Sequence, residues 1–128
     1  RPRRLRRGAR KVGRAAGAVL VAQHASFDMR MLQKAIASNR GAKVWNPSID
    51  TAQLARRVDA GSMSSNHARG VERRGAYQLD NLVRQHDIEV RERHTAAGDA
   101  LATALLLQRL LRKAERRGIK TFGDLIAR

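Results

Sequence analysis

The amino-acid sequence predicts an α/β domain in which short strands alternate with helices along the chain. A continuous apolar run over residues 18–22 is typical of a strand that is buried on both faces. Directly after it, apolar residues recur at helical spacing over residues 26–39, until Gly41 ends the helix. A second strand at residues 43–49 and a helix at 51–59 repeat this order, which favours an α/β sheet over a helical bundle.

The rest of the chain is predicted to be helical, apart from its loops. We expect a polar loop over residues 60–76, a helix over 78–86, a loop around His94, a long helix over 96–117 that is closed by Gly118, and a short final helix that begins with Thr121 and Asp124. The polar loop is rich in glycine and serine and is long enough to be functional.

Charge divides the 128 residues into two parts. The formal net charge is +16, and eight of the positive charges lie within residues 1–14, where no acidic residue occurs. We therefore expect residues 1–16 to form a basic arm, and residues 17–128 to form one domain with a modest core. An excess of this size favours nucleic acid as a partner. Six arm residues are predicted to contact phosphates: Arg3, Arg4, Arg6, Arg7, Arg10 and Lys11.

Cysteine usage and hydropathy indicate the compartment. The chain has no cysteine, which excludes disulfides and thiolate metal sites and favours a reducing compartment. No apolar run is long enough to cross a membrane, and the basic start has no following apolar region of a signal peptide. We therefore expect a cytoplasmic location and no membrane partner.

Asp28 lies where the first strand passes into the first helix. Ser26 is a plausible N-cap of that helix, and Phe27 by itself is expected in the core. In open α/β sheets, ligands bind at the carboxyl ends of the strands, which is where Asp28 is predicted. The alternative is that Asp28 only complements the dipole of the helix.

The segment from His94 to Asp99 precedes and opens the long helix. Positions five apart point away from each other on a continuous helix. If His94 lies in the loop and Asp99 in the first turn, however, the loop can bring the imidazole beside the carboxylate. A base next to a metal-binding carboxylate is what metal-assisted phosphodiester hydrolysis requires.

The two segments together resemble the second and third motifs of the DEDDh-type 3′→5′ exonucleases, and in particular the proofreading epsilon subunits of bacterial replicative DNA polymerases. The matching residues are the apolar strand ending in Ser26-Phe27-Asp28, and Arg93-His94 followed by Asp99-Ala100. Further likenesses are Ile49 to Arg56, Leu79 to Leu82, Arg117 to Ile119 and Gly123 to Leu125. The resemblance covers about residues 17–127 and implies an RNase H-like fold, with a mixed sheet flanked by helices.

The resemblance also implies an activity and a role for several residues. It implies removal of nucleotides one at a time from a 3′ end, by hydrolysis with two Mg²⁺ or Mn²⁺ ions. Asp99 would be a metal ligand, Asp28 would position water around the second metal, and His94 would be the general base. His24, Ser26 and Phe27 would lie on the substrate side. DNA is favoured over RNA as the substrate, and a DNA polymerase is a candidate partner.

One departure from the family pattern bears on activity. The family's first motif, an Asp-x-Glu pair on the first strand, should precede Asp28 by several tens of residues, but no Asp or Glu occurs before Asp28. Gln23-His24 also stands where relatives more often carry His-Asn. We therefore expect residues 17–128 to form the C-terminal part of an exonuclease domain that lacks its N-terminal strands, with little or no activity on its own. The alternative is a catalytically incomplete module that only binds nucleic acid.

Overall fold

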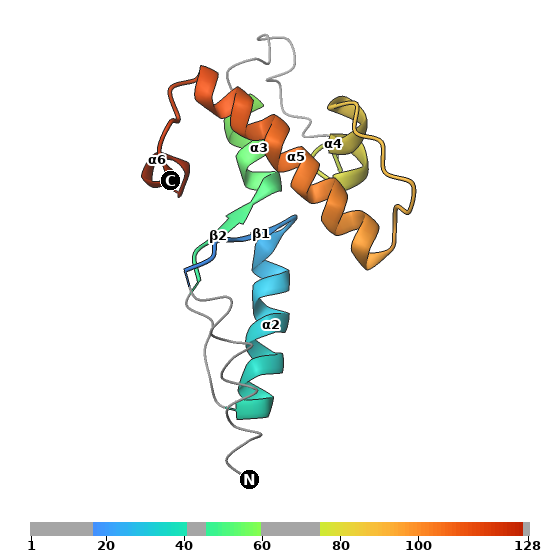
Figure 1. Ribbon diagram of the computed structural model, residues 1–128, viewed down its shortest axis with the longest axis vertical. Helices are drawn as coiled ribbons and strands as arrows, with labels where there is room; N and C mark the ends of the chain where they lie inside the picture. The colour runs from blue at the N-terminus through green and yellow to red at the C-terminus, as the bar shows by residue number, and fades with distance from the viewer. Residues whose placement is uncertain (1–16, 41–45, 60–74, 127–128) are drawn as a thin grey trace.

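The computed structural model describes residues 17–40, 46–59 and 75–126 (Figure 1). The predicted basic arm and most of the predicted polar loop lie outside these residues. The elements in chain order are β1 (Leu20–Ala22), α2 (Ala25–Arg40), β2 (Ser48–Asp50), α3 (Thr51–Asp59), α4 (Leu79–Gln85), α5 (Ala96–Arg116) and α6 (Phe122–Ile126). No helix in the described ranges is both long enough and apolar enough to cross a membrane.

The two strands form a parallel pair that is joined through α2. Val21 lies opposite Ile49, and the pair ends with Ala22 opposite Asp50. The carboxyl ends of both strands therefore meet at one edge, as the α/β prediction requires. The described residues contain no antiparallel strand, so the mixed character of the sheet stays a prediction.

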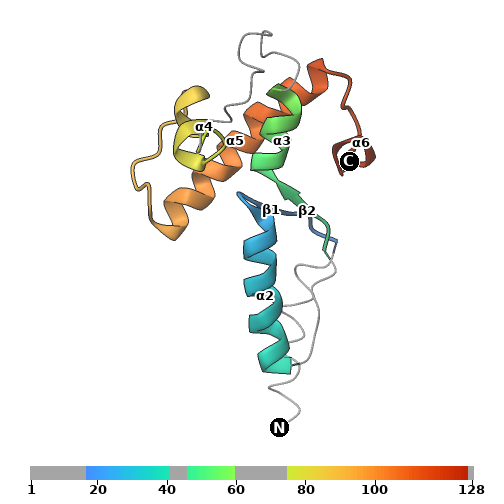
Figure 2. The same cartoon turned by 180° about the vertical axis from the view of Figure 1, so that it is seen from behind.

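Two burial predictions near the first strand are wrong. β1 is only half-buried, because β2 pairs with one of its edges and no described strand pairs with the other. Phe27 is 58% exposed instead of lying in the core. The reason is that α2 extends away from α3, α4 and α5 (Figures 1 and 2) and packs chiefly on the two strands.

The core lies where α3 and α4 pack on α5. Ala102, Leu106, Leu110 and Ala114 recur every four residues on α5, so they form one buried stripe along that helix. Val58 of α3 and Leu82 of α4 are fully buried and form one cluster with the last three residues of this stripe. This cluster packs the second half of α5 against α3 and α4, and the first half of the helix passes beside the end of β1.

The Asp50 carboxylate caps the N-terminal ends of two helices. Its carboxylate accepts hydrogen bonds from the backbone N–H groups of His24 (3.1 Å) and Ala25 (3.1 Å) at the start of α2, and from that of Ala52 (2.9 Å) in α3. α2 begins at Ala25, one residue before Ser26, so the predicted N-cap role of Ser26 is wrong. The Asp50 carboxylate, which is distant in the sequence, accepts hydrogen bonds from the free N–H groups at the start of α2 that a local N-cap side chain would otherwise satisfy.

The final helix begins as predicted. The Asp124 N–H donates to the Thr121 hydroxyl (3.0 Å), and the Thr121 N–H donates to the Asp124 carboxylate (3.2 Å), which is a reciprocal capping pair. The hydroxyl of Thr121, followed by backbone donors, lowers the pKa of Asp124 below its ordinary value. The capping contact therefore favours the ionised carboxylate.

Candidate nuclease cleft

A cleft of about 830 Å³ lies between the carboxyl end of β1 and the first half of α5. Asp28 from α2 and Asp99 from α5 both line it, although they are far apart in the sequence. Val21, Leu79 and Leu107 contribute apolar wall, and Thr103 and Gln108 add polar groups along α5. The structure therefore brings together the two acidic residues singled out by the motifs.

The position of Asp99 follows from a cap at the start of α5. Thr95 is extended, and its hydroxyl accepts a hydrogen bond from the Gly98 N–H (3.0 Å) while donating to the Glu92 carbonyl (2.7 Å). Asp99 consequently lies in the first turn of α5, as the sequence predicted. A negative side chain at this end of a helix is also favoured by the helix dipole.

Gly98 is required by a close backbone approach that the motif reasoning missed. A Cβ atom at this position would lie 1.7 Å from the carbonyl oxygen of Glu92, which is a backbone atom. The loop that carries Arg93 and His94 therefore packs directly against the first turn of α5. The available signal was a glycine within a predicted helix, a position that usually has a packing reason.

His94 lies in the loop before α5, as predicted, but its imidazole is not beside Asp99. The backbone N–H of His94 donates to Asp99 Oδ1 (2.9 Å). The backbone of His94 has a φ of +70°, which lies in the left-handed region. The imidazole is 74% exposed, and its Nε2 lies 4.0 Å from Asp80 Oδ1. The ring is not among the side chains that line the cleft.

Arg93 links the two helices that flank this loop. Its Nη1 donates to Asp99 Oδ1 and its Nη2 donates to Asp80 Oδ1, so one guanidinium bridges the first turns of α4 and α5. The Arg93 side chain is only 18% exposed, in contrast to the two carboxylates at 40% and 55%. Sequence reasoning identified Arg93 only as the residue before the histidine and gave it no contact.

Gln23, one of the departures from the family pattern, has a structural role at the cleft wall. Its amide Nε2 donates to the Tyr77 carbonyl (2.6 Å), and its Oε1 accepts a hydrogen bond from the buried Thr51 hydroxyl. The side chain thereby connects the end of β1 to the start of α3 and to the segment before α4. These contacts are all distant in the sequence, so no local pattern predicts them.

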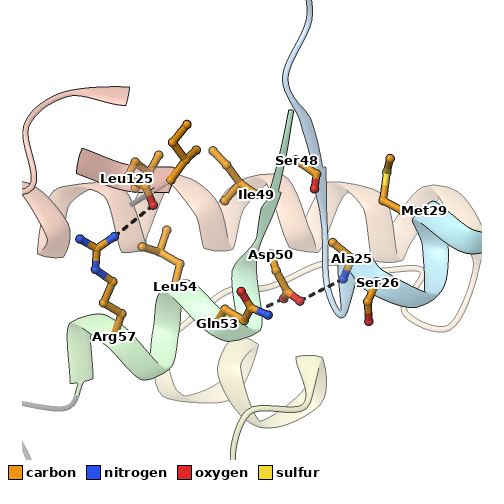
Figure 3. A pocket seen from close by; sticks show the side chains of 11 residues that line it. Ala25, Ser26, Met29, Ser48, Ile49, Asp50, Gln53, Leu54, Arg57 and Leu125 are labelled. Atoms are coloured by element: carbon orange, nitrogen blue, oxygen red, sulfur yellow. Dashed lines mark hydrogen bonds between the residues drawn. The ribbon is translucent and has the colours of Figure 1, made fainter. Parts of the chain in front are cut away.

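The three predicted substrate-side residues do not line this cleft. Ser26 lines a second cleft of about 530 Å³ between α2, β2, α3 and α6. Figure 3 shows this cleft, with the Asp50 carboxylate facing the backbone nitrogen of Ala25 and the Arg57 guanidinium donating to the Leu125 carbonyl. His24 is exposed at a left-handed φ of +59°, and Phe27 is exposed on α2. Their substrate-side role stays a prediction.

The acidic side chains of the cleft offer the donor atoms that a divalent cation prefers. Carboxylate oxygens are the ligands that Mg²⁺ and Mn²⁺ prefer, and each ion takes about six oxygens. Asp28 and Asp99 are the side chains in the described part of the cleft that would hold such an ion. Within the described ranges, no three His, Cys, Asp or Glu side chains gather closely enough to form a metal site by themselves.

Comparison with known proteins agrees with the geometry. The family model described as "Exonuclease" (RNase_T) matches residues 10–107, a range that contains Asp28, His94 and Asp99. The chain belongs to the exonuclease family. The family resemblance that the two motifs indicated is thereby confirmed.

Relatives of this exonuclease-family chain are DNA polymerase III proteins. A DNA polymerase III subunit epsilon-like protein of Rhodobacter capsulatus is 37% identical over 114 residues, which are 88% of this chain and 14% of that protein. The PolC-type DNA polymerase III of Caldanaerobacter subterraneus subsp. tengcongensis is 32% identical over 111 residues, 87% of this chain and 7% of that protein. The PolC-type enzyme of Bacillus subtilis is 35% identical over 108 residues, 84% of this chain and 7% of that protein.

The chain thus spans only 7% to 14% of the length of these relatives. No solved structure matches it significantly.

Proposed function

We propose that this chain carries part of the active site of a DEDDh-type 3′→5′ exonuclease with an RNase H-like fold. The observation that carries the proposal is that Asp28 and Asp99 line one cleft, at the carboxyl end of a parallel pair of strands. The relatives are named as DNA polymerase III proteins, which favours DNA over RNA as the substrate and a polymerase as a partner.

In this proposal Asp99 is a direct metal ligand and Asp28 orients water around a second ion. Mg²⁺ or Mn²⁺ bound there supplies the Lewis acidity for attack of water on the terminal phosphodiester. His94 accepts the proton of the attacking water. Its ring is exposed and its backbone N–H contacts Asp99; in this proposal the imidazole turns toward the cleft from that position.

Turnover by the 128-residue chain alone is expected to be slow or absent. Two carboxylates leave most of the positions around two ions to water, because each ion needs about six oxygen ligands. No Asp or Glu precedes Asp28 to add to them. The expected results are weak cation affinity and a poorly placed attacking water.

A specific observation supports a second candidate function, a nucleic-acid-binding module without catalysis. The net charge of +16 is enough for non-specific attraction to phosphates, which needs no divalent cation. The two functions differ in where the nucleic acid lies relative to Asp99.

Fe²⁺ in place of Mg²⁺ separates the two functions without requiring turnover. In the presence of ascorbate and peroxide, bound Fe²⁺ produces hydroxyl radicals that cleave DNA near the ion. With a 5′-labelled single strand and the full chain, we expect cleavage confined to the last few nucleotides at the 3′ end. Asp99→Asn should remove this cleavage, because it removes the proposed ligand.

Asp87→Asn is the matched control, since Asp87 is an exposed turn residue outside the cleft and should leave the cleavage pattern unchanged. Cleavage spread along the strand, or a 3′ pattern that Asp99→Asn does not alter, would contradict the exonuclease site and favour the binding module.

A further inference from the structure

Both donors that reach Asp99 use the same oxygen. The Arg93 guanidinium and the His94 backbone N–H both donate to Oδ1, and Oδ2 accepts no hydrogen bond from a described residue. A cation in the cleft must therefore bind a carboxylate whose negative charge is already paired with Arg93. The positive charge of Arg93 also opposes a second positive charge at the same group.

Asp80 gives Arg93 a second place to bind. Nη2 of Arg93 donates to Asp80 Oδ1, and Asp80 lies in the first turn of α4, which is anchored by the buried Leu82 and Val83. If Nη1 leaves Asp99, the guanidinium keeps its contact with Asp80 and stays in the loop. A planar guanidinium can contact two carboxylates in this way, whereas an ammonium group is a single point charge.

We propose that Arg93 competes with the divalent cation for Asp99, and that Asp80 retains the guanidinium when the cation takes its place. Arg93 and Asp80 are thus positioning residues that set the cation affinity of the cleft. This inference rests on the proposed function, because it takes Asp99 as a metal ligand. A purely structural role of Arg93, as a support that orients Asp99, would have the opposite effect on affinity.

Titration of the full chain with Mn²⁺, with free Mn²⁺ followed by electron paramagnetic resonance, tests the proposal. Arg93→Gln should lower the dissociation constant for Mn²⁺ by about five- to tenfold, the size expected for a unit charge a few ångströms from a divalent ion near the surface. Asp80→Asn should raise the dissociation constant, because Arg93 then has only Asp99 as a partner. In the Arg93→Gln background, Asp80→Asn should have a clearly smaller effect.

Arg91→Gln is the matched control. Arg91 is exposed in the same loop and makes no hydrogen bond or ion pair with a described residue, so its removal reports the effect of net charge alone. The proposal requires a change of at most about twofold in this variant. Circular dichroism of each variant shows whether the total helix content is retained.

A second pair of variants separates this inference from the proposed function. Asp99→Asn should abolish the gain in affinity when it is combined with Arg93→Gln. If Asp99→Asn weakens Mn²⁺ binding in the wild type but Arg93→Gln does not tighten it, Asp99 is a ligand and the inference about Arg93 is overturned. If Asp99→Asn has no effect in either background, or no variant binds Mn²⁺, both the inference and the metal assignment are overturned.

Discussion

Asp99→Asn and His94→Ala are expected to impair the proposed nuclease activity in different ways. Asp99→Asn should abolish both Mn²⁺ binding and turnover, because an amide is a much poorer ligand for a hard cation than a carboxylate. His94→Ala should slow nucleotide release by about 10²- to 10⁴-fold, the usual contribution of a general base. It should leave Mn²⁺ affinity within about twofold, since the backbone N–H that contacts Asp99 is retained.

The first measurement is single-turnover release of the 3′-terminal nucleotide, made with a longer protein that contains this chain if the 128 residues alone show no turnover. The second is a Mn²⁺ titration of each variant. Asp87→Asn serves again as the control and should change neither quantity. Unchanged turnover in His94→Ala would show that another group accepts the proton. Loss of Mn²⁺ binding in His94→Ala would show that the loop, and not the base, has been disturbed.

Gly98→Ala is expected to lower the free energy of unfolding by about 3 kcal/mol, at the upper end of the range for overpacking. The added Cβ would lie 1.7 Å from the Glu92 carbonyl oxygen, and neither backbone segment can move without breaking the Thr95 cap. The higher helix propensity of alanine, about 1 kcal/mol, does not offset this clash. Urea unfolding of the two proteins measures the difference.

Gly123→Ala is the matched control in α6. Its added Cβ would have its nearest neighbour, the Thr121 hydroxyl oxygen, at 3.7 Å, which is ordinary contact. This variant should be neutral or more stable by up to about 1 kcal/mol. Equal stability of Gly98→Ala and the wild type would mean that the loop does not pack on α5 as described.

The helices were predictable because their signals are local. The spacing of apolar residues and the capping residues predicted α3 at its observed bounds. They placed both ends of α4 and α5, and the start of α6, within about two residues of those observed. Asp99 was placed correctly in the first turn of α5 for the same reason. The apolar run before Asp28 also predicted β1, although not its partial burial.

The contacts that organise the cleft were not predictable, because they join residues that are distant in the sequence. The Arg93 bridge depends on how α4 packs beside α5, and the Asp50 caps depend on the parallel register of the strands. The Gln23 amide reaches two other segments in the same way. A motif specifies residue types at a spacing, whereas side-chain direction follows from tertiary packing.

Paramagnetic broadening by Mn²⁺ tests most directly whether Asp28 and Asp99 belong to one metal centre, as the proposed pair of ions requires. In amide NMR spectra of the full chain, substoichiometric Mn²⁺ should broaden the signals of residues around Asp28 and around Asp99 at the same concentration. An excess of Mg²⁺ should restore both sets of signals together, because the two ions compete for the same oxygens. If only one set broadens, or if the two respond at clearly different Mn²⁺ concentrations, the two carboxylates do not share a site and the proposed nuclease cleft is wrong.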